Sequence, residues 1–196
     1  AAGNGAAMRV APLAFCLDPE VPSDRSTLRD LCRITHRHDE AYVGALAVVR
    51  AIRLVTAGTW APEANLPQLV AEDLPDTRVR DALLVAAGLP KDTSVLTASR
   101  KLGCSGFIAE SVPLAIFAAQ RVARHGLLGV VHETIEAGGD TDTNASIAGQ
   151  IAGAWLGYAR VPRELTDLPQ IRAALDAVRE TAHAVEQLSP NSGEGL

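Results

Sequence analysis

The chain has 196 residues and a net charge of −5, so it fits one domain with enough core to fold and gives no general reason to expect nucleic-acid binding. Hydrophobic residues make up 47% of the chain but aromatic residues only 4%, which favours packed helices over sheets and predicts an all-α fold. No signal peptide, long apolar span or lipidation motif is visible, so we expect no membrane partner. Cys16, Cys32 and Cys104 fit neither a zinc pattern nor a disulfide framework, so we expect a cytoplasmic protein.

Apolar residues recur at helical spacing along most of the chain, and no strand pattern or internal repeat is visible. The strongest helical pattern covers residues 39–57, with Gly58 where a helix stop belongs. Pro113 is expected in the first turn of its helix, where proline is tolerated. The predicted helices cover residues 26–35, 39–57, 67–74, 77–87, 93–102, 109–124 and 127–137, then a glycine-striped helix to Tyr158 and an amphipathic helix over 170–188, before a disordered tail over 189–196.

The most informative stretch is an acidic loop that precedes the glycine-striped helix. Asp140 and Asp142 lie two residues apart, so a turn through Gly138 and Gly139 is needed to aim both carboxylates at one ion. Thr143 can add a third oxygen from the first turn of the helix. Such hard oxygen donors suit Mg²⁺ or Mn²⁺. The alternative is that these residues only cap the following helix, and the pattern alone leaves both interpretations open.

Within the following helix, Gly149, Gly153 and Gly157 recur at every fourth position and therefore share one stripe. Glycine costs about 1 kcal/mol relative to alanine inside a helix, so the stripe predicts closely packed neighbours. The alternative of a membrane helix with a small-residue seam is disfavoured, because the apolar run is too short to span a bilayer.

Three further polar clusters are candidate ligand contacts. Gly3-Asn4-Gly5 offers unobstructed backbone N–H groups for a phosphate or ribose, although Asn-Gly is also an ordinary turn. His36 can donate to a ligand oxygen; the alternative is a solvated turn in which Asp39 caps the next helix. Cys104-Ser105-Gly106-Phe107 precedes a helix N-terminus, where anions bind, and Phe107 can stack on a flat ring or belong to the core. Glu110 is expected to bond to backbone.

Taken in this order, the four clusters resemble the ADP-ribosylglycohydrolase family, which includes dinitrogenase-reductase-activating glycohydrolases and the hydrolases of ADP-ribosylarginine and ADP-ribosylserine. The last block is highly specific, and the resemblance runs from Gly3 to about Leu165. The matching pieces are Gly3-Asn4-Gly5-Ala-Ala-Met8-Arg9-Val10, Thr35-His36 before Gly44-Ala45, Phe107-Ile-Ala-Glu110-Ser111-Val112-Pro113, and Gly138-Gly139-Asp140-Thr141-Asp142-Thr143 with the small residues that follow it.

The resemblance implies an all-α fold whose cleft holds two Mg²⁺ or Mn²⁺ ions. It further implies hydrolysis of an N- or O-glycosidic bond between ADP-ribose and a modified acceptor, through an oxocarbenium-like transition state. Asp140 and Asp142 would be the catalytic carboxylates, and with Thr143 they would supply half of the metal shell. The residues implied in substrate binding are Gly3, Asn4, Gly5, Met8, His36, Ser105, Gly106 and Phe107.

The family also has an earlier half, with a Gly-Asp-x-x-Gly-type stretch and a Thr-Asp-Asp metal motif, and neither occurs in this chain. We therefore expect residues 1–188 to be the C-terminal portion of a single domain of this family. Its partner would be the N-terminal portion, removed or present as a separate chain, and this chain alone would be inactive. The alternative is a non-catalytic ADP-ribose-binding or structural relative, which has no physical need of the three metal-ligand candidates.

Overall fold

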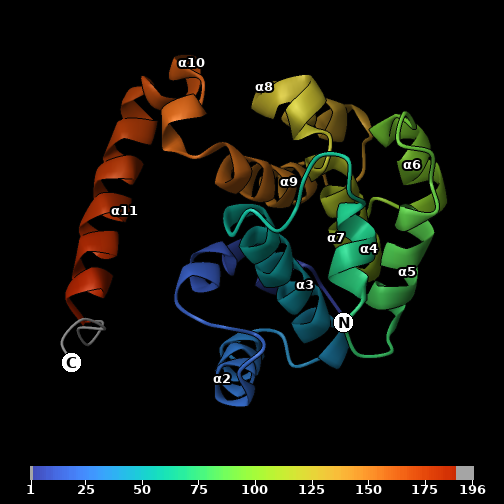
Figure 1. Ribbon diagram of the computed structural model, residues 1–196, viewed down its shortest axis with the longest axis horizontal. Helices are drawn as coiled ribbons and strands as arrows, with labels where there is room; N and C mark the ends of the chain where they lie inside the picture. The colour runs from blue at the N-terminus through green and yellow to red at the C-terminus, as the bar shows by residue number, and fades with distance from the viewer. Residues whose placement is uncertain (1, 189–196) are drawn as a thin grey trace. The chain divides into compact units, whose positions relative to one another are not determined.

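The computed structural model describes residues 2–188, and these are built from helices (Figure 1). Within residues 2–188 the structure has no β-strand and only one isolated β-bridge, so the prediction of an all-α fold is confirmed. The 189–196 tail of the sequence analysis lies outside the described range. In chain order the elements are α1 (Gly5–Arg9), the 3₁₀ helix η1 (Ala11–Phe15), α2 (Pro22–Arg33), α3 (Asp39–Thr56), α4 (Leu66–Ala71), α5 (Arg78–Ala87), α6 (Val95–Leu102), α7 (Ile108–Ala119), α8 (Val122–Glu136), α9 (Thr141–Leu156), the 3₁₀ helix η2 (Tyr158–Arg160), α10 (Arg163–Thr166) and α11 (Pro169–Leu188).

The chain divides into two compact units, the first ending at Ala159 and the second beginning at Arg160. The second unit contains α10 and α11, and α11 confirms the amphipathic helix predicted over 170–188. None of the helices between residues 2 and 188 is both long enough and apolar enough to cross a bilayer. All the predicted site residues belong to the first unit.

Two helices, α3 and α7, form the centre of the first unit. Every residue from Ala41 to Ile52 of α3 is buried, and so is all of α7 except Glu110. A helix that is apolar on every face becomes buried on all sides, and in this stretch of α3 Arg50 is the charged exception. The two helices meet at Gly44, where a Cβ atom would lie only 2.3 Å from Cγ1 of Ile108. Helices α4 and α5 pack against α7, and α9 contacts both α3 and α7 (Figure 1).

Local capping explains where several helices begin and end. The side chain of Thr77 accepts a hydrogen bond from the backbone N–H of Arg80 at the start of α5, and Ser94 does the same for Thr97 in α6. Gly103 (φ +84°) ends α6, as its position after Leu102 predicted. These ends could be predicted because a cap depends on residues adjacent in sequence.

The region around α7 and α8 differs from the prediction. Instead of continuing to Arg124, α7 ends at Ala119, and α8 carries a break at Gly126 (φ +68°). Because α7 begins at Ile108, Pro113 lies in its interior and not in its first turn. A proline there cannot donate to a carbonyl one turn earlier.

Three smaller predictions are also wrong. His38, not Asp39, caps α3, because its Nδ1 accepts the backbone N–H of Glu40 at 3.1 Å. Gly157 (φ +70°) lies just after α9 and ends it, so the helix contains only two members of the glycine stripe. Helix α2 begins at Pro22, four residues before the predicted start, because proline suits a first helical position.

Candidate active site

The first wall of the candidate site forms where the N-terminal segment pairs with the loop before α7. Gly3 and Phe107 make an antiparallel bridge. The backbone N–H of Ile108 donates to the carbonyl of Ala2 at 2.9 Å, and the N–H of Asn4 donates to the carbonyl of Gly106 at 3.2 Å. Two clusters that are about a hundred residues apart in sequence thus lie side by side.

The acidic loop is fastened to the same wall through the backbone carbonyl of Cys104. This oxygen accepts the backbone N–H of Asp140 at 2.8 Å and the side-chain amide of Asn144 at 2.9 Å. Gly138 (φ +79°) and Gly139 (φ +73°) supply the turn, as predicted. A Cβ atom at Gly139 would lie 2.2 Å from the Cys104 oxygen, so only glycine allows this approach.

One hydrogen bond joins the N-terminal loop to the acidic loop. The side-chain amide of Asn4 donates to Oδ2 of Asp140 at 2.7 Å, and Asn4 itself is only 8% exposed. The amide of Asn4 is the main cause that holds the pKa of Asp140 below its ordinary value, with smaller contributions from Asp142 and Thr143, while partial burial opposes the shift. Gly106 lies next to the same carboxylate, since a Cβ atom at this position would be 3.2 Å from Oδ2 of Asp140.

The three predicted metal-ligand residues share the N-terminal end of α9. Asp140 precedes the helix and is half-buried, Asp142 is exposed in the first turn, and the side chain of Thr143 is buried. Asp142 and Thr143 also contribute to the lowered pKa of the Asp140 carboxyl. These oxygens fit one side of a Mg²⁺ or Mn²⁺ shell. Among the described side chains of residues 2–169 and 171–183, no cluster of three or more His, Cys, Asp or Glu could hold a metal by itself.

His36 faces the glycines of the N-terminal loop. A Cβ atom at Gly5 would lie 2.8 Å from Cε1 and 3.0 Å from Nε2 of the imidazole, so alanine would collide with the ring. Arg9 donates to the hydroxyl of Thr35, and that hydroxyl lies 2.8 Å from Nδ1 of His36. The Thr35 hydroxyl can accept the guanidinium and donate to Nδ1, and in that tautomer the ring proton lies on Nε2, the nitrogen that faces the loop.

Other predicted substrate-binding residues are held by contacts within the chain. The hydroxyl and the backbone N–H of Ser105 donate to Oε2 of Glu110 at 2.7 and 3.0 Å, so Glu110 braces this loop through backbone, as expected. Phe107 is half-buried and precedes α7 without capping it by a side-chain bond. Met8 is 41% exposed. Its carbonyl accepts the amide of Gln150 from α9 at 2.9 Å.

Sequence reasoning did not identify the groups that hold the clusters together. The anchors are the carbonyl of Cys104, the buried amide of Asn144 and the Gln150 amide. A backbone carbonyl leaves no signature in the sequence. Asn144 lies within the acidic motif, so its polarity at a buried helix position was a usable signal.

The chain matches the family model described as ADP-ribosylglycohydrolase over residues 1–193. It is 29% identical to human ADP-ribosylhydrolase ARH3, an alignment that covers 95% of this chain and 59% of the human protein. The corresponding protein of Gallus gallus is 28% identical, with coverage of 95% and 56%. The uncharacterised protein YegU of Escherichia coli strain K12 is 31% identical, with coverage of 90% and 55%. The chain therefore spans somewhat more than half the length of the curated relatives it matches.

Proposed function

Since this chain belongs to the ADP-ribosylglycohydrolase family, we propose that it forms the C-terminal portion of a metal-dependent hydrolase that cleaves the glycosidic bond between ADP-ribose and a modified acceptor. The observation that carries the proposal is the hydrogen bond from Asn4 to Asp140, which joins the glycine loop to the acidic loop. A glycine loop for phosphate and ribose then lies next to oxygen donors for Mg²⁺ or Mn²⁺.

In this proposal each cluster has a distinct task. His36 donates from Nε2 to the ribose or phosphate oxygens that lie along Gly3-Asn4-Gly5, and Gly106 and Phe107 border the same ligand. Asp140, held in place by Asn4, and the exposed Asp142 face the scissile bond, where carboxylates stabilise positive charge on the ribose ring. Bound Mg²⁺ or Mn²⁺ would orient the ribose hydroxyls and lower the pKa of the attacking water.

The remaining metal ligands belong to the proposal as well. Asp140, Asp142 and Thr143 all lie at the N-terminal end of α9, so the oxygen atoms that they offer come from one segment of the chain. We assign the other ligands to an N-terminal portion of the same protein, present in one polypeptide or as a separate chain, so that this chain alone is inactive. A cytoplasmic setting is consistent with Cys16, Cys32 and Cys104, which are all free thiols.

The decisive experiment uses the full-length protein that contains this chain. Mn²⁺ is titrated into the wild type and the Asp142→Asn variant, and release of ADP-ribose from a modified protein is measured in parallel with and without a chelator. We expect metal affinity and hydrolysis to fall together in the variant. Equal Mn²⁺ affinities would remove Asp142 from the metal shell. Tight ADP-ribose binding without any hydrolysis would instead favour the non-catalytic binder.

A second measurement addresses the ligand loop. ADP-ribose should protect the full-length protein against heat by an amount set by its concentration relative to Kd. The His36→Ala variant should lose part of this protection, since a hydrogen bond to a charged group contributes about 1.5–3 kcal/mol. Unchanged affinity would make His36 only a turn residue between α2 and α3.

A further inference from the structure

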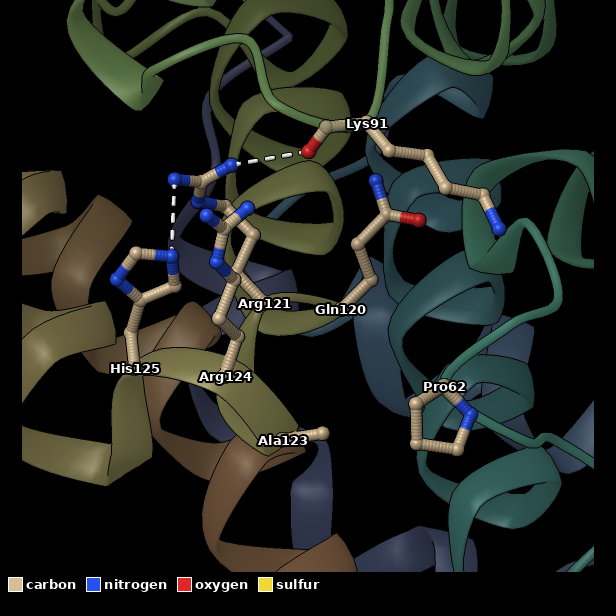
Figure 2. A pocket seen from close by; sticks show the side chains of 7 residues that line it. All are labelled: Pro62, Lys91, Gln120, Arg121, Ala123, Arg124 and His125. Carbon is tan, nitrogen blue, oxygen red and sulfur yellow. Dashed lines mark hydrogen bonds between the residues drawn. The ribbon is translucent and has the colours of Figure 1, made fainter.

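A pocket outside the candidate active site lies where the loop before α6 meets the start of α8 (Figure 2). Its volume is about 210 Å³. Its walls come from three separate segments of the chain, and they carry three cationic side chains, those of Lys91, Arg121 and Arg124. The lining residues are Pro62, Lys91, Gln120, Arg121, Ala123, Arg124 and His125. None of them belongs to the candidate active site.

Arg121 makes the inner wall of this pocket rigid. Its side chain is only 9% exposed, and it donates to the carbonyl of Thr93 at 2.9 Å and to that of Lys91 at 3.2 Å. It also pairs with Glu133 at 2.8 Å, which balances its charge. Arg121 thus fastens the loop that carries Lys91 onto α8.

His125 adds no net charge to the pocket when each of its two ring nitrogens makes the hydrogen bond that its neighbour allows. Its Nε2 lies 3.2 Å from a guanidinium nitrogen of Arg121, which can only donate, so Nε2 accepts (Figure 2). Its Nδ1 lies 3.0 Å from Glu133 and therefore carries the proton. The neutral ring completes the wall beside Arg121.

Two cations of the pocket are left without a carboxylate partner. Among the side chains that the structure describes, those of residues 2–169 and 171–183, no carboxylate lies within ion-pair distance of Lys91 or Arg124. The Lys91 ammonium donates to the backbone carbonyl of Glu63, which holds the side chain across the pocket but leaves its charge unbalanced. Figure 2 shows the Gln120 amide between Lys91 and the two arginines. Two unbalanced cations make the pocket electropositive in a chain whose net charge is −5.

We propose that this pocket is a phosphate-binding subsite. The planar guanidinium of Arg124 can pair with two phosphate oxygens, while Lys91 supplies a point charge and Gln120 an amide donor. Pockets for whole organic ligands typically measure about 300–1,000 Å³, so a volume of about 210 Å³ suits a phosphate group and not an entire nucleotide. The phosphate is either inorganic or the exposed group of a small phosphate ester. The proposal does not depend on the proposed hydrolase activity.

The test compares variants of the full-length protein by calorimetric titration at constant ionic strength. Inorganic phosphate and glycerol phosphate serve as the two probes. Lys91→Gln with Arg124→Gln removes the two unbalanced charges, and both side chains are exposed, so folding should be preserved. Lys101→Gln is the matched control, because it removes an exposed cation that does not line the pocket. His36→Ala reports whether phosphate binds at the ligand loop of the candidate active site instead.

We expect the double variant to bind at least one probe about tenfold or more weakly, the factor that follows from losing one charge-assisted hydrogen bond. Lys101→Gln should bind like the wild type, and loss of binding in His36→Ala but not in the double variant would place the phosphate at the candidate active site and overturn the proposal. A stronger response to glycerol phosphate than to phosphate would identify the group of an organic ester as the occupant, and the reverse would identify the free ion. Equal affinities in the double variant and the Lys101→Gln control, or no binding of either probe to the wild type, would overturn the proposal.

Discussion

Replacing Gly139 with alanine should disrupt the acidic loop, whereas the same change at Gly138 should have a much smaller effect. Both residues have positive φ, +73° and +79°, so alanine meets backbone strain of about 1–2 kcal/mol at either position. Only Gly139 adds a steric conflict. Its Cβ atom would lie 2.2 Å from the carbonyl oxygen of Cys104, whereas the Cβ at Gly138 would have no neighbour within 4 Å.

The conflict at Gly139 cannot be relieved by turning a side chain, because the obstructing atom belongs to the backbone. The same Cys104 oxygen accepts the hydrogen bonds from Asp140 and Asn144, so moving it would weaken both. Overpacking of this kind typically costs about 1–3 kcal/mol. We therefore expect Gly139→Ala to lower the free energy of unfolding by about 3 kcal/mol, roughly twice the effect of Gly138→Ala.

Urea denaturation of the two variants and the wild type, monitored by circular dichroism, measures this difference. Mn²⁺ titration of the folded variants provides a second readout, since the displaced loop should also lose metal affinity in Gly139→Ala. Equal unfolding free energies for the two variants would refute the close approach of Gly139 to Cys104. Reduced stability with unchanged Mn²⁺ affinity would show that this loop is not part of a metal site.

Two further variants, Asn4→Ala at the acidic loop and Gly153→Ala within α9, give three more expected outcomes. Asn4→Ala should weaken Mn²⁺ binding to the full-length protein about tenfold, which is the effect typical of removing a group that orients a metal ligand. Calorimetric titration measures the affinity. An unchanged Mn²⁺ affinity would show that the Asn4 contact does not support a metal site. The Asn4→Ala variant should also lose less stability in acid. Asn4 lowers the folded-state pKa of Asp140, so the stability that this contact adds is present above about pH 4 and is lost as the pH falls through the lowered pKa. Urea unfolding from about pH 3 to pH 6 should therefore show a free energy of unfolding that changes less with pH in the variant than in the wild type. Gly153→Ala should stabilise this chain by about 0.5–1 kcal/mol, because alanine favours the interior of α9 and its Cβ atom would have no neighbour within 4 Å. Thermal unfolding measures this change. Destabilisation of the full-length protein by the same substitution would indicate that the proposed N-terminal portion packs on Gly153.

Most of the helices could be predicted from the sequence because the signals for them are local. The apolar pattern of α3 and the caps of α5 and α6 involve residues within one or two turns of each other. Some predictions failed on local grounds: His38 caps α3, Gly157 ends α9, and α2 begins at Pro22. The start of α7 depends on a distant contact, because Phe107 adopts extended backbone where it pairs with Gly3 and the helix begins directly after it.

The sequence by itself determined the all-α class, the family resemblance, and the glycine turn that carries Asp140 and Asp142. These properties follow from composition, from short motifs and from residues that are neighbours along the chain. Only the tertiary structure decided that Asn4 donates to Asp140, that the Cys104 carbonyl anchors the acidic loop, and that Lys91 and Arg124 share a pocket. The groups in each of these contacts are more than thirty residues apart, so they meet only after the helices have packed and brought them together.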